Sequence, residues 1–235
     1  MRGCFFVLLL GVALLAGVAW FGSGPLVEAA IGAALGGSGY RAAASTISAT
    51  ADPPPRLLLG HADQVSITGS DVDWRALHAR DLSLRLDDVD LFGRTAGTIR
   101  GTISDARIDD GSGGSTPVTS IQLSGPADAA KTTIVVDPAA VRATIVADAA
   151  RQFGITIDDV QLVAPDRLEL VTALGTLEGT LTIDANGALA FATRLGTVPI
   201  LSIDPKLPLR LTSVAVVDRA LELQGVLDVE SLLRG

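Results

Sequence analysis

The sequence is poor in the residues that usually build a reactive or metal-binding site. It has one cysteine, Cys4, and two histidines, His61 and His78. A single cysteine excludes an internal disulfide, and no Cys/His cluster of the kind that holds zinc is present. The chain also lacks the GxSxG, HExxH and GxxxxGK[ST] motifs of hydrolases, metalloproteases and phosphate-binding loops. We therefore expect a protein that is not an enzyme and that uses no metal or cofactor.

Aromatic residues and positive charge are also scarce. Aromatic side chains make up 4% of the chain, and 18 Lys and Arg stand against 26 Asp and Glu, for a net charge of −8. Proteins that bind nucleic acids combine basic patches with aromatic stacking surfaces, and polybasic segments attract anionic membranes. This composition argues against nucleic acid as a partner and against attachment to a membrane by charge alone.

Pairs of acidic residues are the remaining candidates for a catalytic or calcium-binding site. None of these pairs has the spacing of an EF-hand loop, and they fall at strand ends, where aspartate favours turns. An enzyme acting on envelope lipid or glycan would need several of the pairs to meet in one cleft. The pairs are Asp71/Asp73, Asp87/Asp88, Asp109/Asp110 and Asp158/Asp159.

The amino terminus, in contrast, is strongly apolar. Cys4 to Phe21 form 18 consecutive uncharged residues after Arg2, and a helix of that length spans roughly 27 Å, close to the ~30 Å thickness of a membrane's hydrocarbon core. We expect residues 1–24 to be a signal anchor or a signal peptide cleaved near Gly22–Gly24, although Pro25 disfavours cleavage. Both of these alternatives place the rest of the chain on the extracytoplasmic side of the cell membrane. A buried core helix is the third alternative.

The next region, residues 25–56, is predicted to form a short helix followed by a spacer. Pro25 to Leu35 is rich in alanine, begins with proline and is ended by two glycines, which is typical of a short helix. One short strand is expected near Ser45–Ala49. The triple proline Pro53–Pro55 indicates a stiff, extended segment before the main domain at residues 57–235.

In the main domain, apolar residues alternate with polar ones, which predicts β-strands. The pattern is clearest in LSLRL at Leu82–Leu86, and it changes phase at Asp87–Asp88, which predicts a bulge or a turn there. Turn signals at Pro165–Arg167, Asn186–Gly187 and Asp218–Ala220 separate later strands and indicate an antiparallel meander. The other alternating runs are at 121–123, 168–170, 181–183, 189–191, 207–211 and 221–223.

One segment has the period of a helix instead. In DPAAVRATIVADAARQFG, Asp137 is the expected N-cap, Pro138 the first helical residue and Gly154 the stop. Val141, Ile145, Ala149 and Phe153 recur every four residues and form one apolar stripe. We expect this helix to pack its stripe against the strands.

A short pattern occurs twice in the chain. GTIRGTIS at Gly97–Ser104 returns as GTLEGTLT at Gly175–Thr182, and DDVDL and DDVQL precede the two copies. In each copy glycine and Ile or Leu share one strand face, and glycine in a strand often marks a close approach of another group. The pattern favours a notched aliphatic face that includes Ile99, Ile103, Leu177 and Leu181. It arises either from an internal duplication or from a chance similarity of hairpin strands.

Several of these segments resemble a known family. LGTLEGTLTIDANGALAF and LGTVPILSIDPKLPLRLTSVAVVDRALELQGVLDV, with RLLLGHADQVSITGSDV and LSLRLDDVDL, resemble the LmeA-like phospholipid-binding family over residues 45–232. PPPRLLLG stands where family members often carry Gly-Phe-Pro-Phe-Leu. The resemblance implies a tubular lipid-binding fold with an apolar groove and binding of phospholipids, including phosphoinositides. It also implies a role in lipoglycan assembly at an actinobacterial-type envelope, with an envelope glycosyltransferase as a partner.

Together these observations predict an α+β fold: a strongly curved antiparallel meander wrapped around the helix at 138–153, preceded by an N-terminal transmembrane or signal helix. We expect an exported, membrane-tethered phospholipid-binding protein. An acyl chain would lie between the helix stripe and the strand faces; the predicted contacts are Val141, Ile145, Phe153, Ile99, Ile103, Leu177 and Leu181. In the alternative, these residues fill a solid core, and the domain is a structural or interaction module of the cell envelope with an exposed apolar patch.

Overall fold

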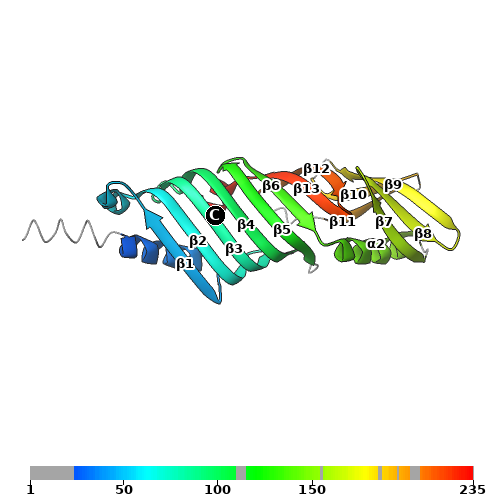
Figure 1. Cartoon of the computed structure of the whole chain (residues 1–235), viewed down its shortest axis with the longest axis horizontal. Helices are drawn as coiled ribbons and strands as arrows, with labels where there is room; N and C mark the ends of the chain where they lie inside the picture. The colour runs from blue at the N-terminus through cyan, green and yellow to red at the C-terminus, as the bar shows by residue number, and fades with distance from the viewer. Residues whose placement is uncertain are drawn as a thin grey trace, which may run out of the picture.

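The computed structural model describes residues 24–109, 115–153, 156–184, 187–194, 196–201 and 207–234. These residues form an elongated molecule in which two antiparallel sheets follow one another along the long axis (Figure 1). The predicted apolar segment at residues 4–21 lies outside the described residues. Within them, no helix combines the length and the apolar content that crossing a membrane requires.

The larger sheet has eight strands in the order β1-β2-β3-β4-β5-β6-β13-β12. Its first six strands follow one another in sequence, each paired antiparallel with the next, so the predicted meander is confirmed here. The strand near Ser45–Ala49 is β1. The strands are β1 (Ala44–Thr50), β2 (His61–Trp74), β3 (Leu77–Asp90), β4 (Thr95–Asp109), β5 (Ser115–Pro126), β6 (Ala130–Val136), β12 (Leu209–Val217) and β13 (Ala220–Leu227).

The smaller sheet has five strands in the order β11-β10-β9-β8-β7. Two predicted turns are confirmed, because β7 pairs with β8 across Pro165 and β12 pairs with β13 across Asp218. Strands β9 and β10 also pair as a hairpin, although Asn186 lies outside the described residues. A backbone hydrogen bond from Val216 N–H to Pro165 O, 2.6 Å long, joins the two sheets. The strands are β7 (Ile157–Val163), β8 (Arg167–Thr172), β9 (Gly175–Ile183), β10 (Leu189–Thr193) and β11 (Gly196–Leu201).

Helices lie at the ends and edges of the sheets. Helix α2 (Pro138–Phe153) begins as predicted, because the Ala139 N–H donates to Asp137 Oδ1 at 2.7 Å. Residues 24–37 are helical, as the alanine-rich pattern indicated, and α3 (Val229–Arg234) ends the described chain. The prolines at 54 and 55 form a 3₁₀ helix, η1 (Pro54–Leu59), and the predicted extended segment is therefore wrong at these positions.

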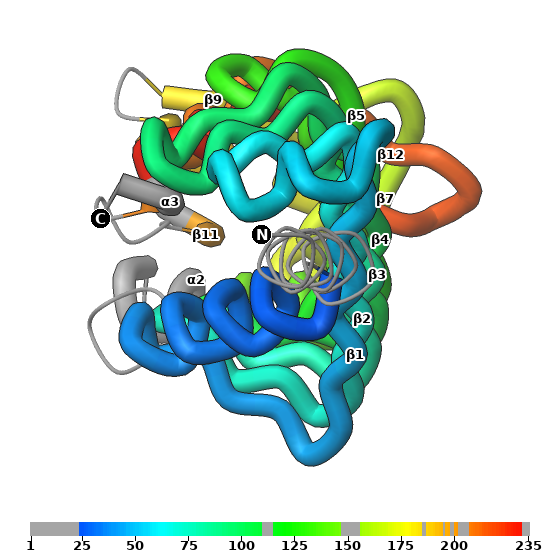
Figure 2. The backbone as a smooth tube through the Cα atoms, turned by 90° about the vertical axis from the view of Figure 1, so that its left-hand side faces the viewer, coloured from blue at the N-terminus to red at the C-terminus, as the bar shows by residue number. Residues whose placement is uncertain are grey.

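The predicted α+β fold class is wrong, because no sheet wraps around helix α2. The helix packs against β7 and β11 of the smaller sheet, where Val141 and Ile145 are buried. The described part of the apolar stripe is thus covered by strands of a mainly β structure. The inner face of the larger sheet is lined by its own aliphatic side chains. Beside its edge strand β1 lies the helix of residues 24–37 (Figure 2), held by a hydrogen bond from Ala49 N–H to Glu28 Oε1 at 3.3 Å.

The long strands of the larger sheet contain single residues in the left-handed conformation. Asp71, Asp88 and Asp105 have φ of 48°, 55° and 47°, and strand pairing continues in register on both sides of each. Aspartate tolerates this conformation better than most residues. The alternation does change phase inside β3, since Leu86 and Val89 are both buried. The predicted bulge or turn at Asp87–Asp88 is wrong, however, because the strand continues in register and Asp88 alone takes the left-handed conformation.

The two copies of the repeated pattern lie in different sheets, one in β4 and the other in β9. Their second glycines, Gly101 and Gly179, do mark close approaches, and the approaching group is the neighbouring strand. A Cβ on Gly101 would clash with Leu84 and lie 2.8 Å from Ser83 O; one on Gly179 would clash with Phe191 and lie 2.5 Å from Ala192 O. The surroundings of the copies differ, because DDVDL lies in β3 beside β4 whereas β8 separates DDVQL from β9.

Replacing either glycine by alanine is expected to destabilise the fold. Gly179→Ala should lower the free energy of unfolding by about 1–3 kcal/mol, because the Ala192 carbonyl belongs to the β9–β10 pairing and cannot move away cheaply. Chemical denaturation measures the change. Gly36→Ala is the control: it is helical with no atom within 4 Å of its Cβ, so a gain of up to about 1 kcal/mol is expected. Equal stability of Gly179→Ala and wild type would contradict the steric account.

Candidate functional site

The inner face of the larger sheet contains a partly open apolar cavity. Its volume is about 120 Å³, and the whole trough around it, including the part open to solvent, holds about 1070 Å³ of space not occupied by atoms. Strands β2 to β6 supply most of the wall. Leu35, from the helix of residues 24–37, and Val229, from α3, border the cavity as well.

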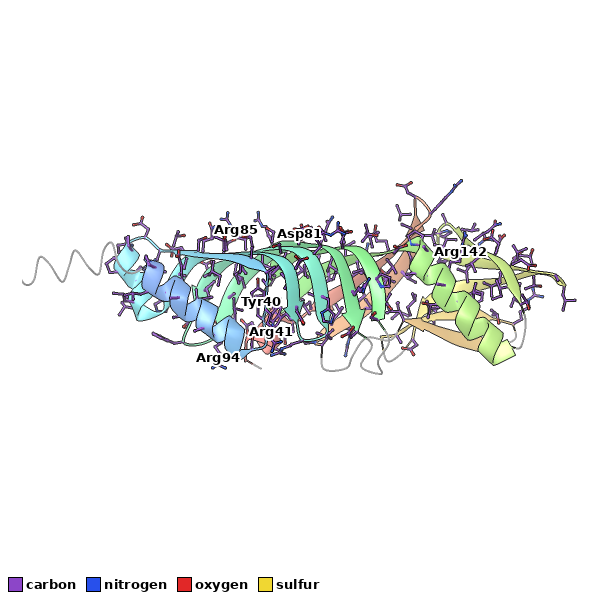
Figure 3. All side chains as sticks on the ribbon, turned by 90° about the horizontal axis from the view of Figure 1, so that it is seen from below. Tyr40, Arg41, Asp81, Arg85, Arg94 and Arg142 are labelled. Carbon is purple, nitrogen blue, oxygen red and sulfur yellow. The ribbon has the colours of Figure 1, made fainter. Side chains whose placement is uncertain are left out.

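The alternating sequence of the strands builds this wall. In β3, Leu82, Leu84 and Leu86 point into the cavity, whereas Arg85 lies on the outer surface and pairs with Asp87 at 3.0 Å. Figure 3 shows Arg85 and Asp81 along the outer side of the sheet, away from Tyr40 and Arg41. The same alternation in the neighbouring strands adds Ile99 and Ile103 from β4 and Ile121 and Leu123 from β5.

The wall offers almost no polar group. Thr132 is the one buried polar residue on it within the described part of the chain, and its hydroxyl donates to Ala130 O of the same strand at 3.3 Å. A cavity of this kind accepts hydrocarbon and rejects charged or strongly hydrated groups, because burying those without partners is unfavourable.

An aromatic pair stands at the end of the cavity where β2 turns into β3. Tyr40 and Trp74 meet edge to face, with ring centroids 6.4 Å apart and planes at 76°. Tyr40 lies over Gly69, which has room for it only because it lacks a side chain: a Cβ there would be 2.5 Å from the tyrosine oxygen. The next residue, Arg75, also borders the cavity and is exposed to solvent.

The structure does not bring the predicted contact residues together. Ile99 and Ile103 are buried in the cavity wall, with 2% and 5% exposure. Leu181 is buried and Leu177 half-buried in β9 of the smaller sheet, so neither lines this cavity. The remaining predicted contacts are on helix α2.

On α2, Val141 and Ile145 are buried against the smaller sheet, and the side chain of Phe153 lies outside the described part. Val141 borders a second hollow of about 530 Å³ between α2, β7 and the β12–β13 turn. That hollow is also lined by Arg142, Asp218 and Arg219, so its surface is mixed rather than apolar.

Residues of the predicted spacer and of other strands contribute to the cavity unexpectedly. Leu35 and Tyr40 precede the main domain in sequence, and nothing in their local pattern connects them with β2. Leu82, Leu84 and Leu86 gave a clear strand signal, but alternation shows only that one face is buried. Trp74 is half-buried on the cavity wall.

Among the described residues, Asp73 and Asp109 from two of the acidic pairs both contact His78, at 3.5 and 3.3 Å, but the other two pairs lie apart. Asp87 and Asp88 lie in β3 and Asp158 and Asp159 in β7, in different sheets. Nowhere in the described residues do three His, Cys, Asp or Glu side chains come close enough to hold a metal ion. The Gln161 side chain, with the Val160 backbone N–H and Arg142, lowers the pKa of Asp159. Hydrogen bonds from Gly93 and Phe92 lower the pKa of Asp90, whereas a general acid needs a raised pKa.

Comparisons with protein-family models, with curated proteins and with solved structures gave no match to this chain.

Proposed function

We propose that the protein binds an acyl chain of a phospholipid in the cavity of the larger sheet. The observation that carries the proposal is a partly open cavity whose wall is almost entirely aliphatic. Burying one CH₂ contributes about 0.8 kcal/mol, so ten methylenes contribute ~8 kcal/mol before the cost of ordering the ligand. This free energy is enough to bind a lipid without charged side chains that contact its headgroup.

The size of the cavity supports a single chain rather than a whole phospholipid. About 120 Å³ is less than the roughly 300–1,000 Å³ of sites that enclose drug-sized ligands. The polar headgroup therefore stays outside, at the rim where Arg75 is exposed. Arg41 is exposed as well. It lies near Arg75 because its backbone pairs with that of Asp73 in β2.

The apolar segment Cys4–Phe21 supports a tether to the membrane from which such a lipid comes. It directly precedes the helix of residues 24–37, whose Leu35 borders the cavity. With the resemblance to the LmeA-like family, we place the protein on the extracytoplasmic side of the membrane. There it would support lipid or lipoglycan assembly together with an envelope glycosyltransferase.

A specific surface favours the second candidate, an interaction module without a lipid. The turn at 91–94 lies beside η1, because Leu91 N–H donates to Gly60 O at 2.8 Å. This brings together Phe92, which is 77% exposed, and Leu59, which is 66% exposed. Exposed apolar patches of this kind commonly mark contacts with other molecules.

Native mass spectrometry of the full chain, released from detergent micelles, tests lipid binding. After incubation with phospholipid vesicles we expect a population whose added mass equals one phospholipid, because one continuous cavity is available in the larger sheet. Lipid extraction and fragmentation then identify the bound species. A spectrum with only the mass of the bare chain, before and after incubation, would refute the proposal and favour the interaction module.

A further inference from the structure

Exposed apolar side chains gather at one end of the molecule. Of the seven large apolar residues that are exposed within the described part of the chain, four form what we call the end patch: Leu26, Leu58, Leu59 and Phe92. Leu58 and Leu59 belong to η1, which lies at one end of the long axis (Figure 1). The ring of Phe92 lies on Gly60, directly after η1, where a Cβ would clash with it.

The helix of residues 24–37 begins at the same end (Figure 1). Glu28, near its start, accepts the hydrogen bond from the Ala49 N–H, and Ala49 lies only a few residues before η1. Leu26 is in the first turn of this helix and is 61% exposed, whereas the next residue, Val27, is buried. The start of the helix therefore adds an apolar side chain to the exposed residues of η1 and of the turn at 91–94.

The apolar segment Cys4–Phe21 ends beside this end of the molecule. Phe21 is three residues before Gly24, the first residue that the structure describes. Three residues span at most about 11 Å, even when fully extended. A membrane tether formed by that segment therefore keeps the start of the helix, and with it the end patch, close to the membrane surface.

The turn that carries Phe92 pairs its backbone donors within the chain. Leu91 N–H donates to Gly60 O at 2.8 Å, and the N–H groups of Phe92 and Gly93 donate to Asp90 Oδ1 at 3.0 and 2.8 Å. Unpaired backbone groups are what makes contact with hydrocarbon unfavourable. This turn can therefore bring an aromatic ring to a lipid surface without exposing these three donors to it.

We propose that the end patch enters the interfacial region of the lipid bilayer in which the segment Cys4–Phe21 is anchored. The inference rests on the tether in the proposed function and does not depend on the lipid cavity. It adds a second membrane contact, which sets the orientation of the molecule: the larger sheet lies next to the bilayer and the smaller sheet away from it. The contact is apolar, and the chain carries a net charge of −8, so it should form on zwitterionic phosphatidylcholine.

A fluorescent label at single positions of the full chain tests this contact. The one native cysteine, Cys4, is replaced by serine, and an NBD group is attached to Leu59→Cys or to Phe92→Cys. The chains are incorporated into phosphatidylcholine nanodiscs. We expect NBD emission at both positions to shift to shorter wavelength. Lipids that carry a nitroxide at the headgroup should quench it, and iodide in solution should not.

Two further positions serve as controls. Leu26→Cys reports on the tether alone, because it directly follows the apolar segment, and its label should be quenched by the nitroxide lipid. Leu174 is 93% exposed in the β8–β9 turn, at the opposite end of the molecule (Figure 1). A label on Leu174→Cys should be quenched by iodide only. Quenching by lipid at position 59 should be the same at low and high salt, because no charge attraction is involved.

The outcomes separate the contact from the tether. Lipid quenching at position 26, with positions 59 and 92 behaving like position 174, would overturn the contact and leave the tether intact. Labels at 59 and 92 that neither iodide nor lipid quenches would also overturn it, because a second copy of the chain would then cover the end patch. Absence of lipid quenching at all four positions would overturn both the contact and the tether. Acyl-chain binding is measured separately, by native mass spectrometry.

Discussion

Ile103→Trp is expected to abolish acyl-chain binding, because the larger side chain would occupy the cavity itself. Ile103 is buried in the wall contributed by β4, and the cavity measures about 120 Å³. Excluding even two methylenes of a ligand removes about 1.6 kcal/mol, which corresponds to more than about tenfold in Kd. Displacement of a fluorescent fatty acid, together with native mass spectrometry of the full chain, measures the loss.

The neighbouring residue provides the matched control. Thr102 lies on the same strand but is exposed on the outer face, so Thr102→Trp adds the same side chain outside the cavity and should leave Kd unchanged. Ile103→Phe adds less volume and keeps the test usable if the tryptophan variant is too unstable, since overpacking a core costs typically about 1–3 kcal/mol. Equal lipid binding by wild type and by a folded Ile103→Trp variant would show that the ligand does not occupy this cavity.

Phe191→Ala is expected to cause the largest loss of stability, about 3–5 kcal/mol in the free energy of unfolding. Phe191 is 1% exposed in β10, and its ring occupies the place where Gly179 of β9 has no side chain. Removing the ring leaves a void bounded by a glycine that cannot fill it. Chemical denaturation of the full chain measures the change.

The control for this prediction is another phenylalanine. Phe92 is 77% exposed, so Phe92→Ala should change the free energy of unfolding by no more than about 0.5 kcal/mol. A similar, small effect of both substitutions would mean that the smaller sheet does not depend on the Phe191–Gly179 contact.

Local patterns predicted the strands and the helix well, because they depend on neighbouring residues. Alternation located β3, β8 and β13, and Asp137 with Pro138 located the start of α2 to the residue. The packing of α2 could not be predicted in this way. An apolar stripe shows that a helix is covered on one side, but Val141 and Ile145 carry no information about which sheet covers them.

The cavity was harder to predict than the strands, because it depends on long-range register. Ile99 and Ile103 were identified from the repeated pattern, yet Leu177 and Leu181, which have the same local pattern, belong to the other sheet. Leu35 and Tyr40 reach the cavity only because residues 24–50 fold back along β2. Pairing of that kind leaves no trace in residue spacing.

The near absence of polar groups along the wall has a further consequence for whatever hydrocarbon lies there. Leucine and isoleucine side chains on β3, β4 and β5 select a ligand by its thickness and length. They do not recognise its functional groups, because apolar contacts are not directional. Straight and methyl-branched tails of similar thickness would therefore be accepted alike. Such a surface suits a protein that must collect and release a mixture of related lipids.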